Sequence, residues 1–285
     1  MAWICTYNPE HIFNTLPENG DINCPECGLK GILVASDTLD TDYENELGLC
    51  VLLMDASWSM TQNNIPPSKK NRLELIAETA ANGIFDLQGI TKAKETYICV
   101  MGFSSEVRTL LFDSVHNIFE RYQGNVDKFA SFFKEELSRM RGDTNINDAL
   151  NAAHVLVEKF LNKELSTLED YEVLYHALWT HDKEDIDVPN VRVLLYTDGQ
   201  HNVPNATDPI INPFSKMKPD ILMGVFVGSE QHEGCDKLKA VLSNCPEHSH
   251  PQFFLLDRFE KLTTLRKLFH MASGTSGFCV KCQKQ

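Results

Sequence analysis

Three oxygen-bearing side chains alternate along the stretch Asp55-Ala56-Ser57-Trp58-Ser59, directly after an apolar run at 48–54. Two further candidates lie downstream, Thr144 in the sequence RGDTNINDAL and Asp198 in the sequence YTDG. Carboxylate and hydroxyl oxygens are hard ligands of the kind that Mg²⁺ and Mn²⁺ prefer. The sequence therefore predicts a divalent-metal site built from Asp55, Ser57, Ser59, Thr144 and Asp198.

Some of these residues also have an ordinary structural interpretation. Asp55 could cap a helix, and Thr144 could cap the helix expected to begin near Ile146; each capping role explains its residue as well as a metal does. The joint occurrence of the motifs favours the metal. Asp143 is expected to support or cap rather than to ligate, and Asp113 is expected to be solvated.

Alternating apolar and amphipathic segments must position these residues. Continuous apolar runs predict buried strands at 48–55, 96–105, 191–199, 220–228 and 252–257, with a hairpin partner at 107–115. Helical spacing of apolar residues predicts helices at 72–88, 126–140, 146–162, about 233–243 and 259–272. This order predicts an α/β, doubly wound, Rossmann-like sheet that is mostly parallel, with one antiparallel edge strand and helices on both faces. Ligands of such sheets bind at the carboxyl ends of the strands, where the candidate residues lie.

The 285 residues divide into three parts. A Cys-rich segment at 1–45 precedes the main domain at 46–272, which carries an acidic insertion at 163–188. A tail at 273–285 follows and contains a second CxxC pair. The two terminal parts are expected to form the halves of one small element.

The cysteine pairs of these terminal parts have the spacing of zinc ligands. A zinc-ribbon-like element assembled from both ends would use four thiolates, those of Cys24, Cys27, Cys279 and Cys282. A local set that combines Cys5 and His11 with Cys24 and Cys27 stays open as an alternative.

The charge balance limits the class of partner. The chain has 26 Lys and Arg against 40 Asp and Glu, a formal net charge of −14, which argues against nucleic acid and anionic membranes. No apolar run approaches the roughly 18 residues of a membrane span, and the first residues do not have the pattern of a signal peptide. We therefore expect a cytoplasmic protein.

The three motifs together resemble a known family. DASWS after an apolar strand, the Thr in GDTNINDAL and TDG after VRVLLY occur in the order found in von Willebrand factor A domains with a metal-ion-dependent adhesion site. The resemblance covers about 46–272. It implies that Ser57, Ser59 and Thr144 bind the metal through their hydroxyls, and that Asp55 and Asp198 act largely through water. It also implies that a carboxylate of a partner protein completes the coordination.

With its extra cysteines, the chain is loosely similar to bacterial TerY-type members of that family. This similarity implies a partner such as a kinase, phosphatase or AAA ATPase in a stress or defence complex. The expected function is a metal-dependent protein-interaction module with Trp58 and His201 at the partner surface. We do not expect an enzyme, because the sequence has no P-loop, GxSxG or HExxH motif. A Mg²⁺-dependent hydrolase or phosphatase-like enzyme, and a structural scaffold with a vacant site, remain as alternatives.

Overall fold

The computed structural model describes residues 3–5, 12–13, 33–35, 48–62, 65, 68–89, 96–162, 190–203, 208–217, 221–244 and 250–258. Near the N-terminus, three short strands form an antiparallel sheet in the order β2-β1-β3, with bounds β1 (Trp3–Cys5), β2 (Ile12–Phe13) and β3 (Leu33–Ala35).

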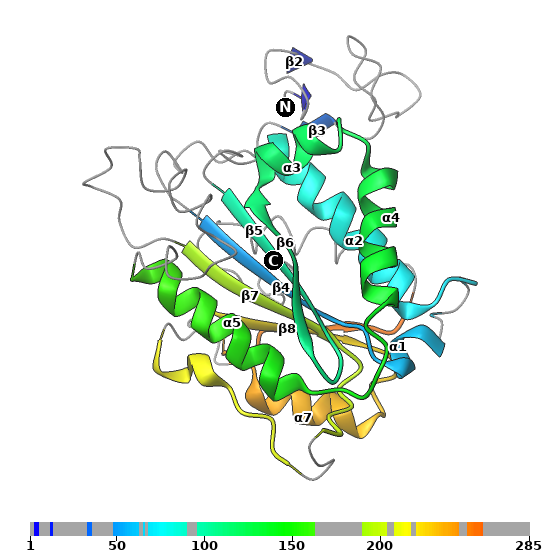
Figure 1. Ribbon diagram of the computed structural model, residues 1–285, viewed down its shortest axis with the longest axis vertical. Coiled ribbons are helices and arrows are strands. Elements are labelled where there is room, and N and C mark those ends of the chain that lie inside the picture. The colour runs from blue at the N-terminus through cyan, green and yellow to red at the C-terminus, as the bar shows by residue number, and fades with distance from the viewer. Residues whose placement is uncertain are drawn as a thin grey trace.

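A six-stranded sheet forms the centre of the main domain, in the order β6-β5-β4-β7-β8-β9 (Figure 1). Its strands are β4 (Gly48–Asp55), β5 (Thr96–Phe103), β6 (Val107–Ser114), β7 (Asn190–Thr197), β8 (Leu222–Val227) and β9 (Phe253–Leu256). All neighbours pair in parallel except β6, which runs antiparallel to β5 at the edge. The predicted α/β fold with one antiparallel edge strand is therefore confirmed.

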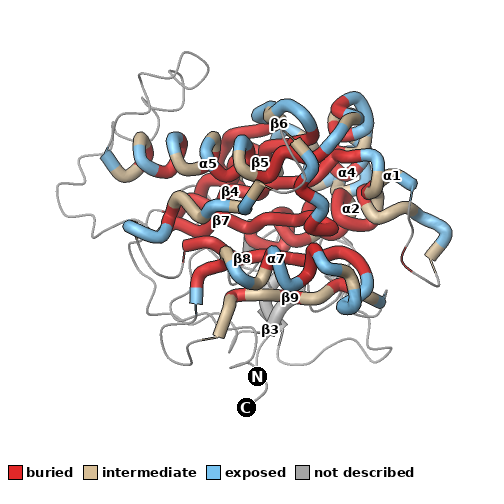
Figure 2. Tube along the Cα trace, turned by 90° about the horizontal axis from the view of Figure 1, so that it is seen from below, coloured by how far each residue is buried: buried red, intermediate tan, exposed pale blue. Residues whose placement is uncertain are grey.

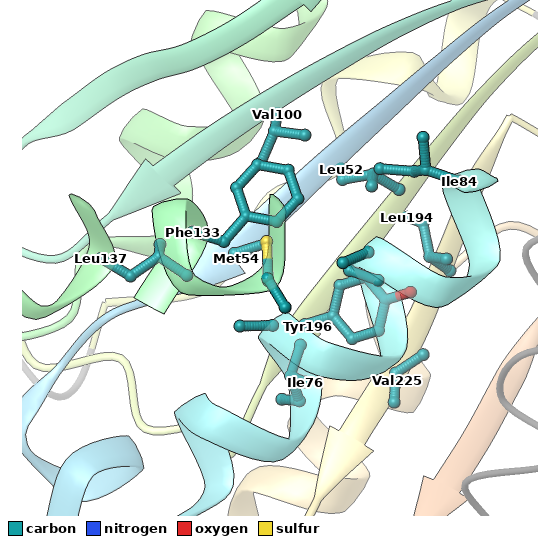
Figure 3. Close-up of a cluster of buried hydrophobic side chains, with 14 of the residues drawn as sticks. Leu52, Met54, Ile76, Ile84, Val100, Phe133, Leu137, Leu194, Tyr196 and Val225 are labelled. Carbon is teal, nitrogen blue, oxygen red and sulfur yellow. The ribbon is translucent and has the colours of Figure 1, made fainter. Parts of the chain in front are cut away.

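Helices cover both faces of this sheet because its central strands are apolar on both sides. Leu52 and Met54 of β4 pack in the same cluster as α2 (Arg72–Asp86) and α4 (Val126–Ser138). Val51 and Leu53 alternate with them along the strand and pack in the cluster that contains α5 (Ile146–Leu161) and α7 (Glu233–Val241). Figure 3 shows the first cluster, and Figure 2 shows that burial is concentrated along the strands.

Several short helices escaped the prediction. These are α1 (Trp58–Gln62), α3 (Val115–Arg121) and two 3₁₀ turns, η2 (Leu87–Gly89) and η5 (Pro213–Lys216). Segments of one or two turns are too short to show a helical period. Most predicted strands and helices also end one or two residues earlier than the apolar pattern suggested.

The expectation that Asp113 is solvated was wrong. Its side chain is buried near the end of β6, where the chain turns into α3. Oδ1 accepts hydrogen bonds from the backbone N–H of Ser114 (2.9 Å) and from Nδ2 of Asn117 (2.8 Å), and Oδ2 pairs with Arg121. Asp113 thus joins the end of the strand to the whole length of the short helix.

Several expectations fall on residues outside the described ranges. These are the acidic insertion at 163–188, the helix at 259–272, and the zinc candidates His11, Cys24, Cys27, Cys279 and Cys282. Cys5 lies in β1.

The helices in the described part of the chain are all too short or too polar to cross a membrane.

Candidate functional site

The carboxyl ends of the central strands bring the two candidate acids together. Asp55 is the last residue of β4, and Asp198 follows the last residue of β7, the strand that pairs with β4 in parallel. Met54 lies opposite Tyr196 in this register, which places Asp55 level with Thr197. Both carboxylates are buried, each 2% exposed. Two residues more than a hundred positions apart therefore lie side by side at the carboxyl ends of two central strands.

Hydrogen bonds fix both oxygens of Asp55. The Thr197 hydroxyl donates to Oδ2 (2.7 Å), and the backbone N–H of Ser57 donates to Oδ1 (2.9 Å). The second bond closes a tight turn between β4 and α1, a role for which aspartate is well suited. Asp55 thus supports the turn before a helix instead of serving as its N-cap, since α1 begins at Trp58.

The two serines of the motif face one another across this turn. Their Oγ atoms are 3.1 Å apart, and the Ser57 carbonyl accepts a hydrogen bond from the N–H of Met60 (3.1 Å), inside α1. Trp58, between the serines, is 51% exposed, and the Arg141 guanidinium lies 5.5 Å from the centre of its ring. Alternation therefore separates the serine hydroxyls from an outward-facing aromatic side chain.

Backbone hydrogen bonds join the loop that carries Thr144 to the same carboxyl ends of the strands. The Trp58 N–H donates to the Gly142 carbonyl (3.2 Å), and the Asn145 N–H donates to the Ser104 carbonyl just beyond β5 (2.8 Å). Thr144 is 1% exposed. These contacts bring the segment that carries Thr144 against the turn that carries Ser57.

The capping interpretation of Thr144 was wrong. The N-cap of α5 is Asn145, whose Oδ1 accepts from the N–H of Asp148 (3.2 Å). The backbone of Thr144 bonds to Asn202 instead of to the helix: its N–H donates to Oδ1 of Asn202 (2.7 Å), and its carbonyl accepts from the N–H of Asn202 (3.1 Å). Its hydroxyl is therefore not needed for the helix. The neighbouring Asp143 is exposed.

Two glycines allow the Asp198 loop to approach α7 closely. Gly199 has a φ of +75°, and a Cβ there would lie 2.5 Å from the carbonyl oxygen of Gly234. A Cβ on Gly234 would in turn lie 3.0 Å from the carbonyl oxygen of Asp198. Glycine is required at position 199 because a side chain would both strain the backbone and collide with the helix.

The electrostatics of the site favour a cation. Burial, and after it the nearby charge of Asp198, raise the pKa of Asp55 to about 7. Arg72, the first residue of α2, places Nη1 3.2 Å from Oδ2 of Asp198. Within the described ranges, the pair of buried carboxylates thus has one guanidinium as a partner, and a divalent cation would offset the remaining repulsion.

The donor set fits a hard cation only if hydroxyls take part. Among the described residues, no group of three or more His, Cys, Asp or Glu side chains is placed to hold a metal. Two carboxylates with the hydroxyls of Ser57, Ser59 and Thr144 supply oxygen donors alone, which suits Mg²⁺ or Mn²⁺ better than Zn²⁺.

His201 differs from the expectation of a residue at the partner surface. It is 6% exposed, and its Nδ1 accepts a hydrogen bond from the N–H of Ile146 (3.2 Å), at the start of α5. Its Nε2 lies 3.4 Å from Nδ2 of Asn147. Burial lowers the pKa of His201, which agrees with a neutral ring that accepts at Nδ1. His201 therefore helps to hold the helix that follows Thr144.

Sequence patterns missed four residues that build this site: Arg72, Ser104, Thr197 and Asn202. Thr197 could have been found, because its hydroxyl directly follows the apolar run that leads to Asp198. Arg72 and Asn202 carry no such signal, since their partners lie far along the chain.

A cavity of about 190 Å³ lies beside the site, between the loop after β7 and the start of α7. It is lined by Gly199, Gln200, His201, Asn202, His232, Glu233 and Lys237. None of the five proposed metal ligands lines it.

Comparisons with known proteins give a likeness in fold. No family model matches the chain. No curated protein matches it either. Solved structures that match include proximal thread matrix protein 1 from the mussel byssus, with 16% identity and a TM-score of 0.44 over 79% of this chain and 46% of that one. Another is a manganese-loaded TRAP protein from Plasmodium vivax, with 17% identity and a TM-score of 0.45 over 81% and 75% of the two chains.

A further match is an aerotolerance-related membrane protein from Bacteroides fragilis, with 12% identity and a TM-score of 0.43 over 79% and 98% of the two chains. One structure of the mussel protein has a zinc-occupied MIDAS motif, where MIDAS is the metal-ion-dependent adhesion site. The chain spans less than half the length of the mussel protein. The neighbours are von Willebrand factor A-type domains, and at this level of similarity they assign neither a ligand nor a function to the chain.

Proposed function

We propose that the chain is a metal-dependent protein-interaction module. Ser57, Ser59 and Thr144 would hold Mg²⁺ or Mn²⁺ through their hydroxyls, while Asp55 and Asp198 would act largely through water. The observation that supports this proposal most is the pair of buried carboxylates, Asp55 and Asp198, next to the turn that carries the serine hydroxyls. The Arg72 guanidinium neutralises one of their two negative charges. A bound cation would supply an electrophilic centre that accepts an outside oxygen ligand.

The charge of the site favours a carboxylate as that outside ligand. Asp55 and Asp198 together contribute two negative charges, and Arg72 returns one positive charge at Asp198. A divalent cation would then leave a formal excess of one positive charge in a buried setting, where electrostatic attraction is stronger than in water. A partner's Asp or Glu would neutralise this excess, so the proposed partner is a protein that presents an acidic side chain.

Binding is favoured over hydrolysis by the surroundings of the possible bases. A pKa near neutrality would suit Asp55 for proton transfer, but the carboxylate is buried and both oxygens accept hydrogen bonds from the protein. His201 is also buried and holds α5. The exposed Trp58 and the adjacent Arg141 offer a surface that a protein partner can contact.

Calorimetry with Mg²⁺ and with Mn²⁺ tests the metal. We expect Ser57→Ala and Asp198→Asn each to weaken affinity by about tenfold or more, because each removes one oxygen donor or its charge. Asp127→Asn is the control: it neutralises an exposed carboxylate in the first turn of α4, a helix that carries none of the five proposed ligands, and should leave the affinity unchanged. Equal affinity in the wild type and all three variants would refute the site.

Water-proton relaxation of the Mn²⁺ complex tests whether the metal keeps a coordination position for a carboxylate of the partner. A peptide with a single Glu should displace metal-bound water and lower the relaxation enhancement, whereas the same peptide with Gln should not. An unchanged signal with both peptides would favour a scaffold role for the chain.

Turnover in a screen of phosphate esters would favour the hydrolase alternative. A kinase, phosphatase or AAA ATPase that binds the protein can then be tested for release by EDTA.

A further inference from the structure

Ser104 carries a buried hydroxyl and is not one of the five proposed metal ligands. The residue is 1% exposed, and its Oγ has no hydrogen-bond partner among the described residues. A buried hydroxyl without a partner costs free energy, and native structures leave few of them. The next residue, Ser105, is exposed to solvent, whereas Ser104 is buried.

The backbone at Ser104 contacts two of the loops that carry the proposed metal ligands. The carbonyl of the preceding Phe103 accepts a hydrogen bond from the N–H of Ala56 (2.7 Å), the residue between Asp55 and Ser57. The Ser104 carbonyl accepts from the N–H of Asn145 (2.8 Å), the residue after Thr144. A Cβ on Gly142 would lie 2.9 Å from Oγ of Ser105 and 3.4 Å from Oγ of Ser104, so both side chains lie next to the loop that leads to Thr144. Of these two serines, Ser104 is the buried one.

We propose that Ser104 is a further positioning residue of the metal centre, and that its hydroxyl binds a water molecule coordinated to the cation. This inference rests on the proposed function. Among the described residues the hydroxyl makes no hydrogen bond to a proposed ligand, although its backbone adjoins the segments that carry Asp55, Ser57 and Thr144. A bridging water would satisfy the buried hydroxyl and link it to the centre. A water polarised by a divalent cation is also a strong hydrogen-bond donor, and the oxygen of a neutral hydroxyl accepts that hydrogen bond without adding charge to the centre.

The rival explanation is a structural water that bridges Ser104 to backbone groups with or without a metal. The two explanations predict different effects of removing the hydroxyl on metal affinity and on stability. If the water belongs to the cation, removing the hydroxyl weakens metal binding and leaves the metal-free protein as stable as before. If the water is structural, removal changes stability equally in both states and leaves metal affinity unchanged.

The experiment compares Ser104→Ala with the control Ser105→Ala in the full chain. Calorimetry with Mn²⁺ measures affinity, and urea unfolding is measured in EDTA and in saturating Mn²⁺. We expect Ser104→Ala to lower Mn²⁺ affinity about tenfold, to unfold in EDTA at the same urea concentration as the wild type or higher, and to gain less stability from Mn²⁺. Ser105→Ala should match the wild type throughout, and Ser104→Thr should restore most of the affinity.

Wild-type Mn²⁺ affinity in Ser104→Ala, or an equal loss of stability with and without Mn²⁺, would overturn the assignment of Ser104. If the variant is too unstable to measure, Ser104→Cys, which keeps the size of the side chain and replaces the hydroxyl by a weak acceptor, provides the same comparison with Ser104→Thr. A wild-type protein that binds no Mn²⁺ would overturn the metal centre itself, a result that is distinct from failure of Ser104 alone.

Discussion

Asp55 is the residue on which the electrostatics of the site depend. Its carboxyl is fully buried, and burial together with the Asp198 charge raises its pKa to about 7. The folded, metal-free protein therefore holds this proton more tightly than the unfolded chain does. The resulting stabilisation is complete below the unfolded pKa of about 4 and is lost as the pH rises towards 7.

This shift predicts the pH dependence of unfolding in EDTA. Between pH 5 and pH 8 the Asp55 contribution to the free energy of unfolding should fall by roughly 2–3 kcal/mol. Other groups also titrate, so the measurement is the difference between the wild type and Asp55→Asn in urea unfolding at both pH values. We expect the variant to lose less stability over this interval than the wild type. Parallel pH profiles would mean that Asp55 is ionised normally.

At the scale of elements, α2 and β7 are linked through the site. Arg72 begins α2, directly after the N-cap Asn71, and reaches Asp198 beyond the end of β7. A positive charge at the N-terminus of a helix is unfavourable for the helix dipole. Its place there is explained by Asp198, whose buried carboxylate needs a partner.

Arg72→Gln should destabilise the metal-free protein by about 1–3 kcal/mol, because it leaves Asp198 buried without its ion pair. The loss should be smaller in saturating Mg²⁺, because the cation would supply part of the missing charge. Urea unfolding with and without Mg²⁺ measures both effects. Lys70→Gln is the control: its ion pair with Glu78 is largely exposed, and its loss should cost no more than about 1 kcal/mol in either condition. An identical penalty for Arg72→Gln in both conditions would contradict a cation beside Asp198.

At the scale of the whole molecule, the terminal cysteine pairs are proposed to hold one structural zinc. Three other cysteines, Cys50, Cys99 and Cys235, are buried in the described part of the chain. Burial raises the pKa of Cys50 to about 12, so this thiol does not compete for metal at neutral pH. Substitution of individual terminal cysteines is therefore needed to assign any zinc that the purified protein contains.

We expect one zinc per chain by elemental analysis, with a loss of thermal stability when it is removed. Cys279→Ser should lose the zinc if both ends contribute ligands, whereas Cys5→Ser should lose it if the N-terminal set is correct. Cys99→Ser controls for the loss of a buried thiol and should keep its zinc. Full zinc content in both Cys279→Ser and Cys5→Ser would contradict both ligand sets.

The sequence by itself determined the class of the fold and the candidate ligands. Short continuous apolar runs such as 48–54, followed directly by polar residues, favour strands covered on both faces, and their alternation with amphipathic segments predicts the order of strands and helices along the chain. Polar residues that directly follow such runs lie at the carboxyl ends of the strands, which places Asp55 and Asp198 at the same end of the sheet. The pairing of β4 with β7, which makes the two residues neighbours, is a feature of the assembled sheet. Asp113 at the end of β6 shows the limit of this logic, because a carboxylate at a strand end also serves a following helix.

Tertiary structure alone decided how the site is held and which charges meet in it. Arg72 and Asp198 are 126 positions apart, and Thr197 and Asp55 are 142 apart. Such pairs have no period and no local spacing, because the contact exists only after the sheet has assembled. The burial of His201 and of Ser104 depends in the same way on loops that pack from several elements. Local sequence specifies which groups reach the edge of the sheet, and the packing of distant segments specifies which of them are buried, paired or left for a ligand.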